Sequence, residues 1–277
     1  EGAVAHGAGQ GDEYGPALWE WSQTQLDQFE ITAQQGTDVP TVAQSGHQSA
    51  YCMELDVTAA EGTAGANEFN VISYHVTGSD FTSLSQQQVT FNFWHKHTIT
   101  GEHNVSFSNS ANNRSYVAEY TQSSTNTWEE ATITLTLDTS GTWLDTEADI
   151  GLKISLGVLV GSDFHFTADT WGANANGYGT TGSANNLSST SNFMRFAQVG
   201  LYLGSTAPTF LGESVATVLN QTDYYVQRIG TDAANTRIGA GFNFSTTRTD
   251  IYMAYRRGMR TTPTFTEVGS GWNTIGG

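Results

Sequence analysis

Apolar and polar residues alternate along several short segments of the chain, which is the pattern of β-strands with one buried face. The clearest alternation runs over 131–137, where four apolar residues are separated by three threonines. In 89–99 the apolar face of Val89, Phe91 and Phe93 continues into His95 and His97. Similar alternation marks 51–57, 69–76, 116–120, 150–160 and 193–203. The pattern predicts many short strands, with every second residue of 150–160, from Ile150 to Val160, pointing inward.

Turn and helix signals separate these strands. Thr100-Gly101 follows 89–99 and precedes a new apolar face at Val105, which predicts a β-hairpin. Residues 172–190 are rich in Gly, Asn, Ser and Thr and predict a long loop of the kind that often carries function. Helical spacing of apolar residues occurs only in 213–223. Strands are expected again at 237–244 and 249–255.

These elements predict an all-β fold: an antiparallel β-sandwich of the jelly-roll type, followed by a short helix and a small β module. We expect a flexible leader at 1–14, a jelly-roll domain at 15–207, and the helix with its β module at 208–277. Pro208 marks the boundary. The last part is expected to serve in assembly, because about 70 residues bury a small core.

Composition supports strands and narrows the class of protein. The chain has 39 threonines and 2 lysines, and only 13% of its residues are charged, which excludes a coiled coil. No apolar run approaches the roughly 18 residues of a membrane span. Cys52 is the one cysteine, so an intrachain disulfide is excluded, and we expect it to be buried. Both ends suggest the mature or ordered part of a longer protein.

Charge is distributed unevenly along the chain. The net charge is −17; residues 1–207 hold 22 acidic and 4 basic residues, and 208–277 hold 5 acidic residues and 6 arginines. A body this acidic repels phosphates and anionic membranes, so neither nucleic acid nor a membrane is an expected partner. Binding of a cation by clustered carboxylates stays open as an alternative.

Catalytic and metal-binding motifs are weak in this sequence. It has no G-x-S-x-G, G-x-x-x-x-G-K-[ST] or G-x-G-x-x-G motif, and spacing alone selects no catalytic pair among 27 acidic residues. We therefore expect no enzymatic activity. The acids considered are Glu119, Glu129, Glu130, Asp138, Asp145, Glu147 and Asp149.

Two metal sites were weighed from the spacing of possible ligands. His95, His97 and His103 could converge on zinc, although buried or rim histidines are commoner at the end of a strand. The acidic loop from Asp145 to Asp149 offers oxygen ligands for calcium. We expect no cofactor and no assigned metal ligands; a structural Ca²⁺ stays open without assigned residues.

A series of short motifs occurs in a fixed order along 69–265. The motifs are Phe93-Trp94-x-Lys96, Thr100-Gly101, Arg114-Ser115-Tyr116, Thr127-Trp128-Glu129, Gly141-Thr142-Trp143, Ile150-Gly151-Leu152, Gln198-Val199-x-Leu201, the helix from Glu213 to Tyr225, and Met259-Arg260-Thr261-Thr262-Pro263. This series resembles the jelly rolls, similar to carbohydrate-binding modules, in tail fibres and other virion appendages of tailed bacteriophages. The resemblance implies a non-enzymatic virion protein, extracellular on an external appendage and often a homotrimer. Its implied partners are a host cell-surface glycan and other virion proteins.

Aromatic side chains are the candidates for glycan binding, because pyranose rings stack on them through C–H faces. Tyr178, which lies in the long loop, and Trp171, which directly precedes it, are favoured, whereas Trp128 and Trp143 are expected to pack. The candidate glycan-binding residues are Trp94, Tyr116, Tyr120, Trp171 and Tyr178. The candidate assembly residues are Tyr224, Tyr225, Arg256, Arg257 and Arg260.

Two alternatives to host recognition remain from the sequence. One is a secreted polysaccharide-degrading enzyme or its detached carbohydrate-binding module. The other is a virion decoration protein that binds no ligand.

Overall fold

The computed structural model describes residues 3–8, 10, 13–14, 19–24, 28–146, 149–173, 176–212, 214–225, 241–245 and 248–251. The chain forms two compact units, Glu1–Gly212 and Glu213–Gly277. The division falls a few residues beyond the boundary expected at Pro208. The role of the second unit in assembly stays a prediction.

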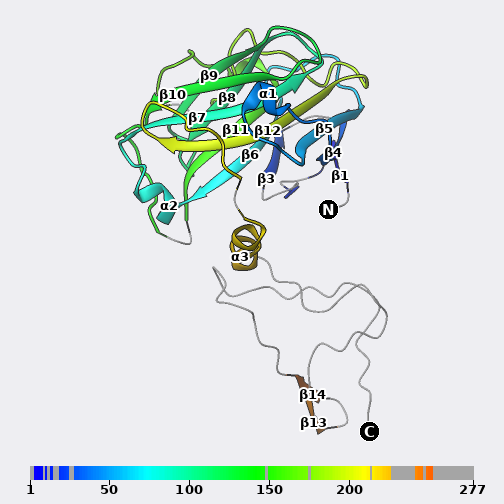
Figure 1. The fold of residues 1–277 in the computed structure, drawn as a ribbon, viewed down its shortest axis with the longest axis vertical. Helices are drawn as coiled ribbons and strands as arrows, with labels where there is room; N and C mark the ends of the chain where they lie inside the picture. Colours follow the sequence, from blue (N-terminus) through cyan, green and yellow to red (C-terminus); the bar gives the residue numbers. More distant parts are fainter. Residues whose placement is uncertain are drawn as a thin grey trace. The chain divides into compact units, whose positions relative to one another are not determined.

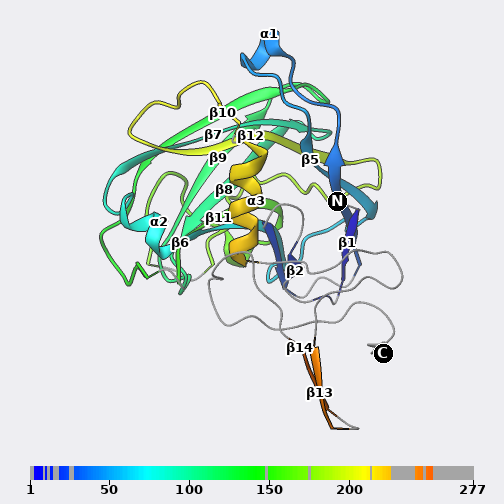
Figure 2. The ribbon, with the colours of Figure 1, turned by 60° about the horizontal axis from the view of Figure 1, so that its bottom comes forward.

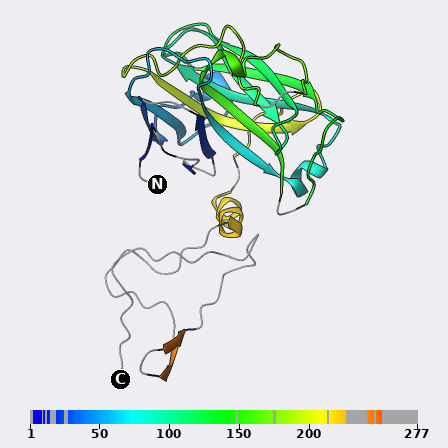
Figure 3. The ribbon, with the colours of Figure 1, turned by 180° about the vertical axis from the view of Figure 1, so that it is seen from behind.

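Unit 1 is a sandwich of two six-stranded antiparallel sheets, which Figures 1 and 3 show from opposite sides. Sheet A has the order β1-β4-β5-β12-β7-β10, formed by Val4–Gly7, Glu30–Gly36, Cys52–Ala59, Phe193–Leu203, Gln88–His97 and Glu129–Thr136. Sheet B has the order β2-β3-β6-β11-β8-β9, formed by Glu13–Tyr14, Trp19–Thr24, Phe69–Thr77, Ile150–Val160, Gly101–Ser108 and Ser115–Gln122. From β5 to β8, and again from β9 to β12, successive strands alternate between the sheets, as in a jelly roll.

Helices are short and few among the described residues. Unit 1 contains α1 (Val42–Ser45), α2 (Gly78–Thr82) and the 3₁₀ helix η2 (Ser162–Phe164). Figure 2 shows α1 projecting from the sandwich, and none of its residues is buried. Unit 2 contains α3 (Val215–Tyr225) and the hairpin of β13 (Gly241–Ser245) and β14 (Arg248–Ile251). No helix in the described part of the chain is long and apolar enough to span a membrane.

The predicted fold class is confirmed, because the described chain is mainly antiparallel strands in two stacked sheets. The segments predicted between residues 51 and 203 correspond to β5 through β12. The expectation of a flexible leader at 1–14 is wrong for Val4–Gly7, which pair with β4 as strand β1. His6 of this strand is buried and stacks on Trp21, with ring centroids 5.0 Å apart. Because the His6 ring is buried, Val4–Gly7 are part of the sandwich and not of a flexible leader.

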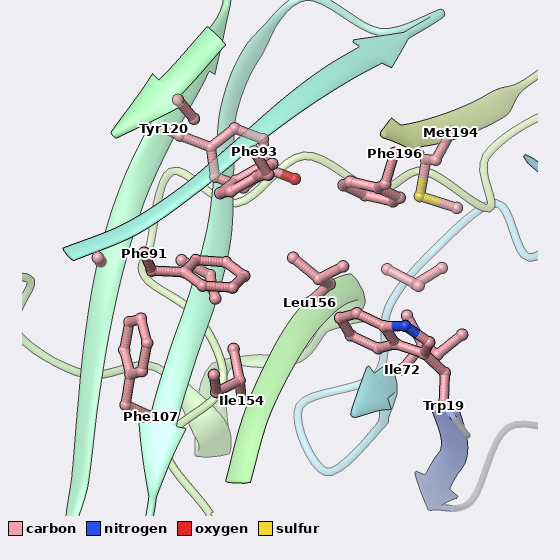
Figure 4. Close-up of a cluster of buried hydrophobic side chains, with 14 of the residues drawn as sticks. Trp19, Ile72, Phe91, Phe93, Phe107, Tyr120, Ile154, Leu156, Met194 and Phe196 are labelled. Carbon is pink, nitrogen blue, oxygen red and sulfur yellow. The ribbon is translucent and has the colours of Figure 1, made fainter. Parts of the chain in front are cut away.

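The core lies between the two sheets and is built from the inward residues of both (Figure 4). Phe91 on β7 and Phe107 on β8 meet edge to face, with ring centroids 5.7 Å apart. Phe93 meets Tyr120 on β9 in the same manner at 5.0 Å. Leu156 on β11 is 1% exposed. These contacts join strands of sheet A to strands of sheet B. The apolar residues that alternate along each strand therefore pack together in one shared core.

Strict alternation fails near the end of β11. A β-bulge between Gly157 and Leu159 shifts the register with β6, so Val158 and Leu159 both reach the central core. Val160, which we expected to point into that core, instead packs against Phe69 in a separate cluster. A bulge adds one residue to a strand and reverses the face of every residue after it.

Replacing Leu156 by alanine is expected to lower the free energy of unfolding by about 2–5 kcal/mol, because it leaves a cavity between the sheets. The matched control is Leu203→Ala, at a leucine that is 61% exposed, and it is expected to cost about 0.5 kcal/mol or less. Urea denaturation followed by tryptophan fluorescence measures both values. Equal losses for the two variants would contradict this assignment of the core.

Candidate functional site

Four of the five aromatic residues expected to bind glycan are buried, each no more than 9% exposed; they are Trp94, Tyr116, Tyr120 and Tyr178. Stacking on a sugar requires an open ring face, which these four rings do not offer in this structure. The fifth, Trp171, is half-buried, as a surface platform requires. Four of the candidate rings therefore pack, and the role of Trp171 in glycan binding stays a prediction.

Tyr116 and Tyr120 point into the central core between the sheets, whereas Trp94 and Tyr178 lie outside it, where alternation does not reveal what covers them. Trp94 lies on the outer face of sheet A, where it clusters with Cys52, Trp128 and Val39. Tyr178 packs on the outer side of sheet B against Phe69, with ring centroids 4.7 Å apart. The pattern of one strand cannot show that a distant loop crosses its outer face, and this is why these rings appeared exposed.

Residues 37–50, here called the outer strap, connect β4 to β5 along sheet A. Asp38 of the strap accepts hydrogen bonds from Lys96 Nζ at 2.7 Å and Trp128 Nε1 at 3.2 Å, and it pairs with Arg195. Burial alone would raise the pKa of Asp38, but these bonds outweigh it and lower the pKa. The ion pairs hold the strap in place, which explains why Trp94 and Trp128 are covered.

Two half-buried tryptophans meet where the edge strands of the two sheets end. Trp171 and Trp143 lie 5.6 Å apart between ring centroids and are nearly perpendicular, at 84°. Trp171 also contacts Tyr116 at 5.4 Å, and Trp143 stacks on Phe81 at 5.2 Å and 15°. We call Phe81, Tyr116, Trp143 and Trp171 the aromatic edge. The sequence predicted that Trp143 packs, and it does pack against the core. That prediction did not include its half-buried position beside Trp171.

Trp171 is fixed by both neighbouring edge strands. Two bridges to β9 hold its loop, Val117 with Ala168 and Ser115 with Gly172. The indole Nε1 donates to the carbonyl of Thr136 at the end of β10, at 2.8 Å. The loop therefore covers the edge of sheet B and ties Trp171 to sheet A. Covering an edge in this way also blocks pairing with other chains.

Trp143 is held by a buried amide and a tight turn. Asn109 is fully buried; its Nδ2 donates to the carbonyl of Thr142 at 3.0 Å, and its Oδ1 accepts the Arg114 N–H. Gly141 has φ +82°, and a Cβ there would lie 2.5 Å from Cγ of Arg114. Glycine is therefore required at this turn. The indole Nε1 of Trp143 donates to the carbonyl of Ser140 at 2.7 Å.

The polar groups beside the aromatic edge are mainly carboxylates. Asp169 has φ +57° and accepts the hydroxyl hydrogen of Tyr116 at 3.2 Å. Burial and this carboxylate raise the pKa of Tyr116 to about 12. Arg114 is paired with Asp138. Four described acidic residues, Asp138, Asp145, Asp149 and Asp169, lie in the loops at this end, and those loops contain one arginine, Arg114, so the surroundings of the aromatic edge are negative.

The acidic residues considered for catalysis mostly form structural bonds. Glu129 accepts the backbone N–H groups of Ser123 and Ser124, each at 2.8 Å. Burial alone would raise the pKa of Glu129, but these bonds lower it. The pKa of Asp138 is lowered in the same way, against the effect of burial, by the Ser140 N–H and by Arg114.

The other acidic residues named as catalytic candidates are bonded to neighbouring side chains or exposed. Glu130 accepts from Asn92 at 3.0 Å, and Asp149 accepts the hydroxyl hydrogen of Thr146. Glu119 is exposed on β9 and Asp145 is exposed in the loop after β10, while Glu147 lies outside the described residues.

Within the described ranges, no group of three or more His, Cys, Asp or Glu side chains is placed to hold a metal ion. The histidines weighed as zinc ligands stack instead: the His97 and His103 centroids are 4.0 Å apart at 18°. Cys52 is buried as expected, and burial raises the pKa of its thiol to about 11. A structural Ca²⁺ stays a hypothesis.

The candidate assembly residues belong to the second unit. Tyr224 and Tyr225 are the last two residues of α3. Arg256, Arg257 and Arg260 lie outside the described residues. Their role in assembly stays a prediction.

Three solved structures are similar to this chain, each with low sequence identity and a low TM-score. One is the enzymatically active domain of tailspike protein 4 from bacteriophage CBA120, with 12% identity, 69% of this chain covered, and a TM-score of 0.37. This chain spans about a fifth of it, since the match covers 20% of the tailspike chain.

The other two are carbohydrate-binding modules. A CBM4 structure has 14% identity, covers 69% of this chain and 97% of its own, and gives a TM-score of 0.35. TmCBM61 in complex with β-1,4-galactotriose has 13% identity, covers 70% and 91%, and gives a TM-score of 0.32. No protein-family model and no curated protein sequence matches the chain.

Asn109→Ala is expected to lower the free energy of unfolding by about 1–3 kcal/mol, because it leaves the N–H groups of Asn113 and Arg114 and the carbonyl of Thr142 without their side-chain partner. Asn113→Ala, at an exposed residue that accepts a single bond from Asn109, is expected to cost less. Thermal and urea unfolding measure both variants. An Asn109→Ala protein as stable as the parent would contradict the proposed role of this amide in holding Trp143.

Proposed function

We propose that this chain is a non-catalytic glycan-binding protein of a tailed-bacteriophage virion. It recognises a host surface glycan through the aromatic edge. The observation that carries the proposal is the pair of half-buried, nearly perpendicular indoles of Trp143 and Trp171 at the rim of the sandwich.

The chemistry of the pair suits a sugar. Both indole N–H groups are already bonded to backbone carbonyls, so the solvent-facing remainder of each side chain is apolar ring. An apolar ring stacks on the C–H face of a pyranose, and neighbouring carboxylates and amides accept or donate to its hydroxyls. Asp169 and Asn113 supply such groups beside the rings. Because both indoles are held by their neighbours, little side-chain entropy is lost on binding.

The charge of the site favours neutral glycans. Four described acidic residues, Asp138, Asp145, Asp149 and Asp169, lie in the loops around the aromatic edge, and the one arginine of those loops is paired with Asp138. Uronic, sialic or phosphorylated glycans would meet like charge here, which weakens binding. A neutral hexose carries hydroxyl donors for the carboxylates without that repulsion.

The absence of catalysis is supported by the state of Asp138, which is paired with Arg114 beside the site. The lowered pKa of Asp138 keeps it ionised at neutral pH, so it does not hold the proton that a general acid must deliver. Asp138 also accepts the backbone N–H of Ser140 and so fixes a turn.

The virion setting is supported by the ordered series of sequence motifs, which resembles jelly rolls of phage appendages. We propose an extracellular position on a tail or other external appendage, with other virion proteins as neighbours, and assembly as a homotrimer through 208–277. Linked copies raise avidity without new contacts, so a weak single site suffices for attachment.

Trp171→Ala is expected to weaken binding of a neutral oligosaccharide at least tenfold, because a stacking surface is lost. Trp171→Phe, which keeps a smaller ring, should weaken it less. A glycan array with the full chain selects the neutral oligosaccharide, and titration calorimetry measures the dissociation constants.

The matched control is Tyr51→Ala, since Tyr51 is an aromatic residue elsewhere on the surface and 54% exposed. It should bind like the parent. A glycan array with no signal for the full chain would support the alternative of a virion decoration protein that binds no ligand. Release of reducing ends from a polysaccharide would support the alternative of a polysaccharide-degrading enzyme. Either result overturns the proposal. Binding that survives Trp171→Ala refutes the aromatic edge as the site.

A further inference from the structure

Three histidines and a tyrosine lie together between the sheets, away from the aromatic edge. His95 and His97 come from β7, His103 from β8 and Tyr120 from β9. Each histidine is no more than 2% exposed. The centroid of His97 lies 4.0 Å from that of His103 and 5.3 Å from that of His95. We call these four side chains the histidine cluster.

Hydrogen bonds fix where the proton sits on His95. The Nε2 amide of Gln122 donates to the carbonyls of Ser124 and Thr127, at 2.7 and 2.8 Å, so its Oε1 faces His95 and His97. Oε1 accepts from His95 Nδ1 at 3.1 Å and from the backbone N–H of His97 at 2.9 Å. His95 therefore carries its hydrogen on Nδ1.

His103 is bonded in the opposite sense. Its Nε2 lies 3.1 Å from the carbonyl of Ile99, so Nε2 carries the hydrogen and donates. Nδ1 is then an acceptor, and it receives the Asn186 Nδ2 hydrogen at 3.3 Å. The same Nδ2 donates to the carbonyl of Val158 at 3.2 Å. The Asn186 amide cannot turn over, because its oxygen would then face that carbonyl.

Asn186 belongs to residues 184–192, which lead from the long loop into β12 and which we call the closing segment. Its backbone N–H donates to Val158 at 3.1 Å, and its carbonyl accepts from Asn192 Nδ2 at 3.1 Å. Leu187 is fully buried in the central core. The closing segment thus reaches the core next to His103.

The surroundings of the cluster contain little that would stabilise a positive charge. Among the described residues, the titratable groups that face it are Tyr120 and, at the start of β10, Glu129, which acts on His95. β12 contributes Phe196, whose ring lies 5.4 Å from that of His97. The closing segment contributes the Asn186 amide.

Burial lowers the pKa of His95 and of His103 to about 4, and that of His97 well below its ordinary value. All three are neutral at pH 7. The unfolded chain takes up protons as the pH falls below about 6.5, whereas the folded chain does so only near pH 4. Stability therefore falls as the pH drops between these values. Each histidine raises the unfolding equilibrium constant by up to tenfold per pH unit.

We propose that His103 and Asn186 form an acid-sensitive latch that holds the closing segment against the core. Protonation of Nδ1 places a second donor against the Asn186 amide, and the bond between them is lost. The closing segment is then released from the core before the strands of the sandwich separate. This proposal does not depend on glycan binding.

His103→Gln tests the latch, because the glutamine amide can donate to Ile99 and accept from Asn186 but does not titrate. Hydrogen exchange followed by mass spectrometry gives protection factors for 184–192, corrected for the pH dependence of intrinsic exchange. In the parent we expect protection of 184–192 to fall about tenfold per pH unit between pH 6 and pH 4.5, ahead of β5. In His103→Gln this fall should be absent.

The matched control is His165→Gln. His165 lies, like the closing segment, between β11 and β12; it is half-buried and bonds the carbonyl of Val160 through Nε2 at 3.0 Å. It should keep the pH dependence of the parent. Equal pH dependence in the parent and in His103→Gln overturns the latch.

If His103→Gln does not fold, a second measurement on the parent protein tests the proposal. The ¹⁵N shift of His103 Nδ1 in the parent should report an unprotonated nitrogen down to about pH 5. Protonation near pH 6.5 with 184–192 still protected would overturn the proposal.

Discussion

Contact between the inward aromatic faces of the two sheets is the interaction on which the rest of the described sandwich depends. Phe91 and Phe93 of sheet A meet Phe107 and Tyr120 of sheet B edge to face, and this brings the edge strands β9 and β10 close together. Only where those edges come close can one tryptophan bond a carbonyl of β10 while its own loop pairs with β9. The surface that Trp143 and Trp171 form at the rim of the sandwich therefore depends on the packing of the core.

The sequence was sufficient to predict the strands and their buried faces, because alternation is a local signal. The face of Val89 through His97 and the helix near 213–223 follow from spacing alone. Alternation could not predict β1, since His6 is buried through its partner Trp21 in a different sheet. The bulge at Gly157 was missed for a related reason: its evidence is the register with β6 and not the composition of β11.

The candidate site was predictable only in part. Trp171 stands out as an aromatic residue in a Gly- and Asn-rich loop, but Trp94 and Tyr178 are covered by segments distant in sequence. Exposure of a side chain depends on which loops cross its strand, and ion pairs such as Asp38 with Lys96 decide that path. The one signal for Trp143 was its position after a strand beside Gly141, whose positive φ shapes the turn.

The loop that carries Trp171 is attached to β9 at two points, Ala168 and Gly172. Between them lie three residues, 169–171, whose backbone path is fixed at both ends. Under the proposed function, ligand preference at this rim would diversify by exchange of side chains at these three positions. An insertion between Ala168 and Gly172 would detach the loop from β9 and expose the edge of that strand. The loop can therefore vary in its side chains but not in its length.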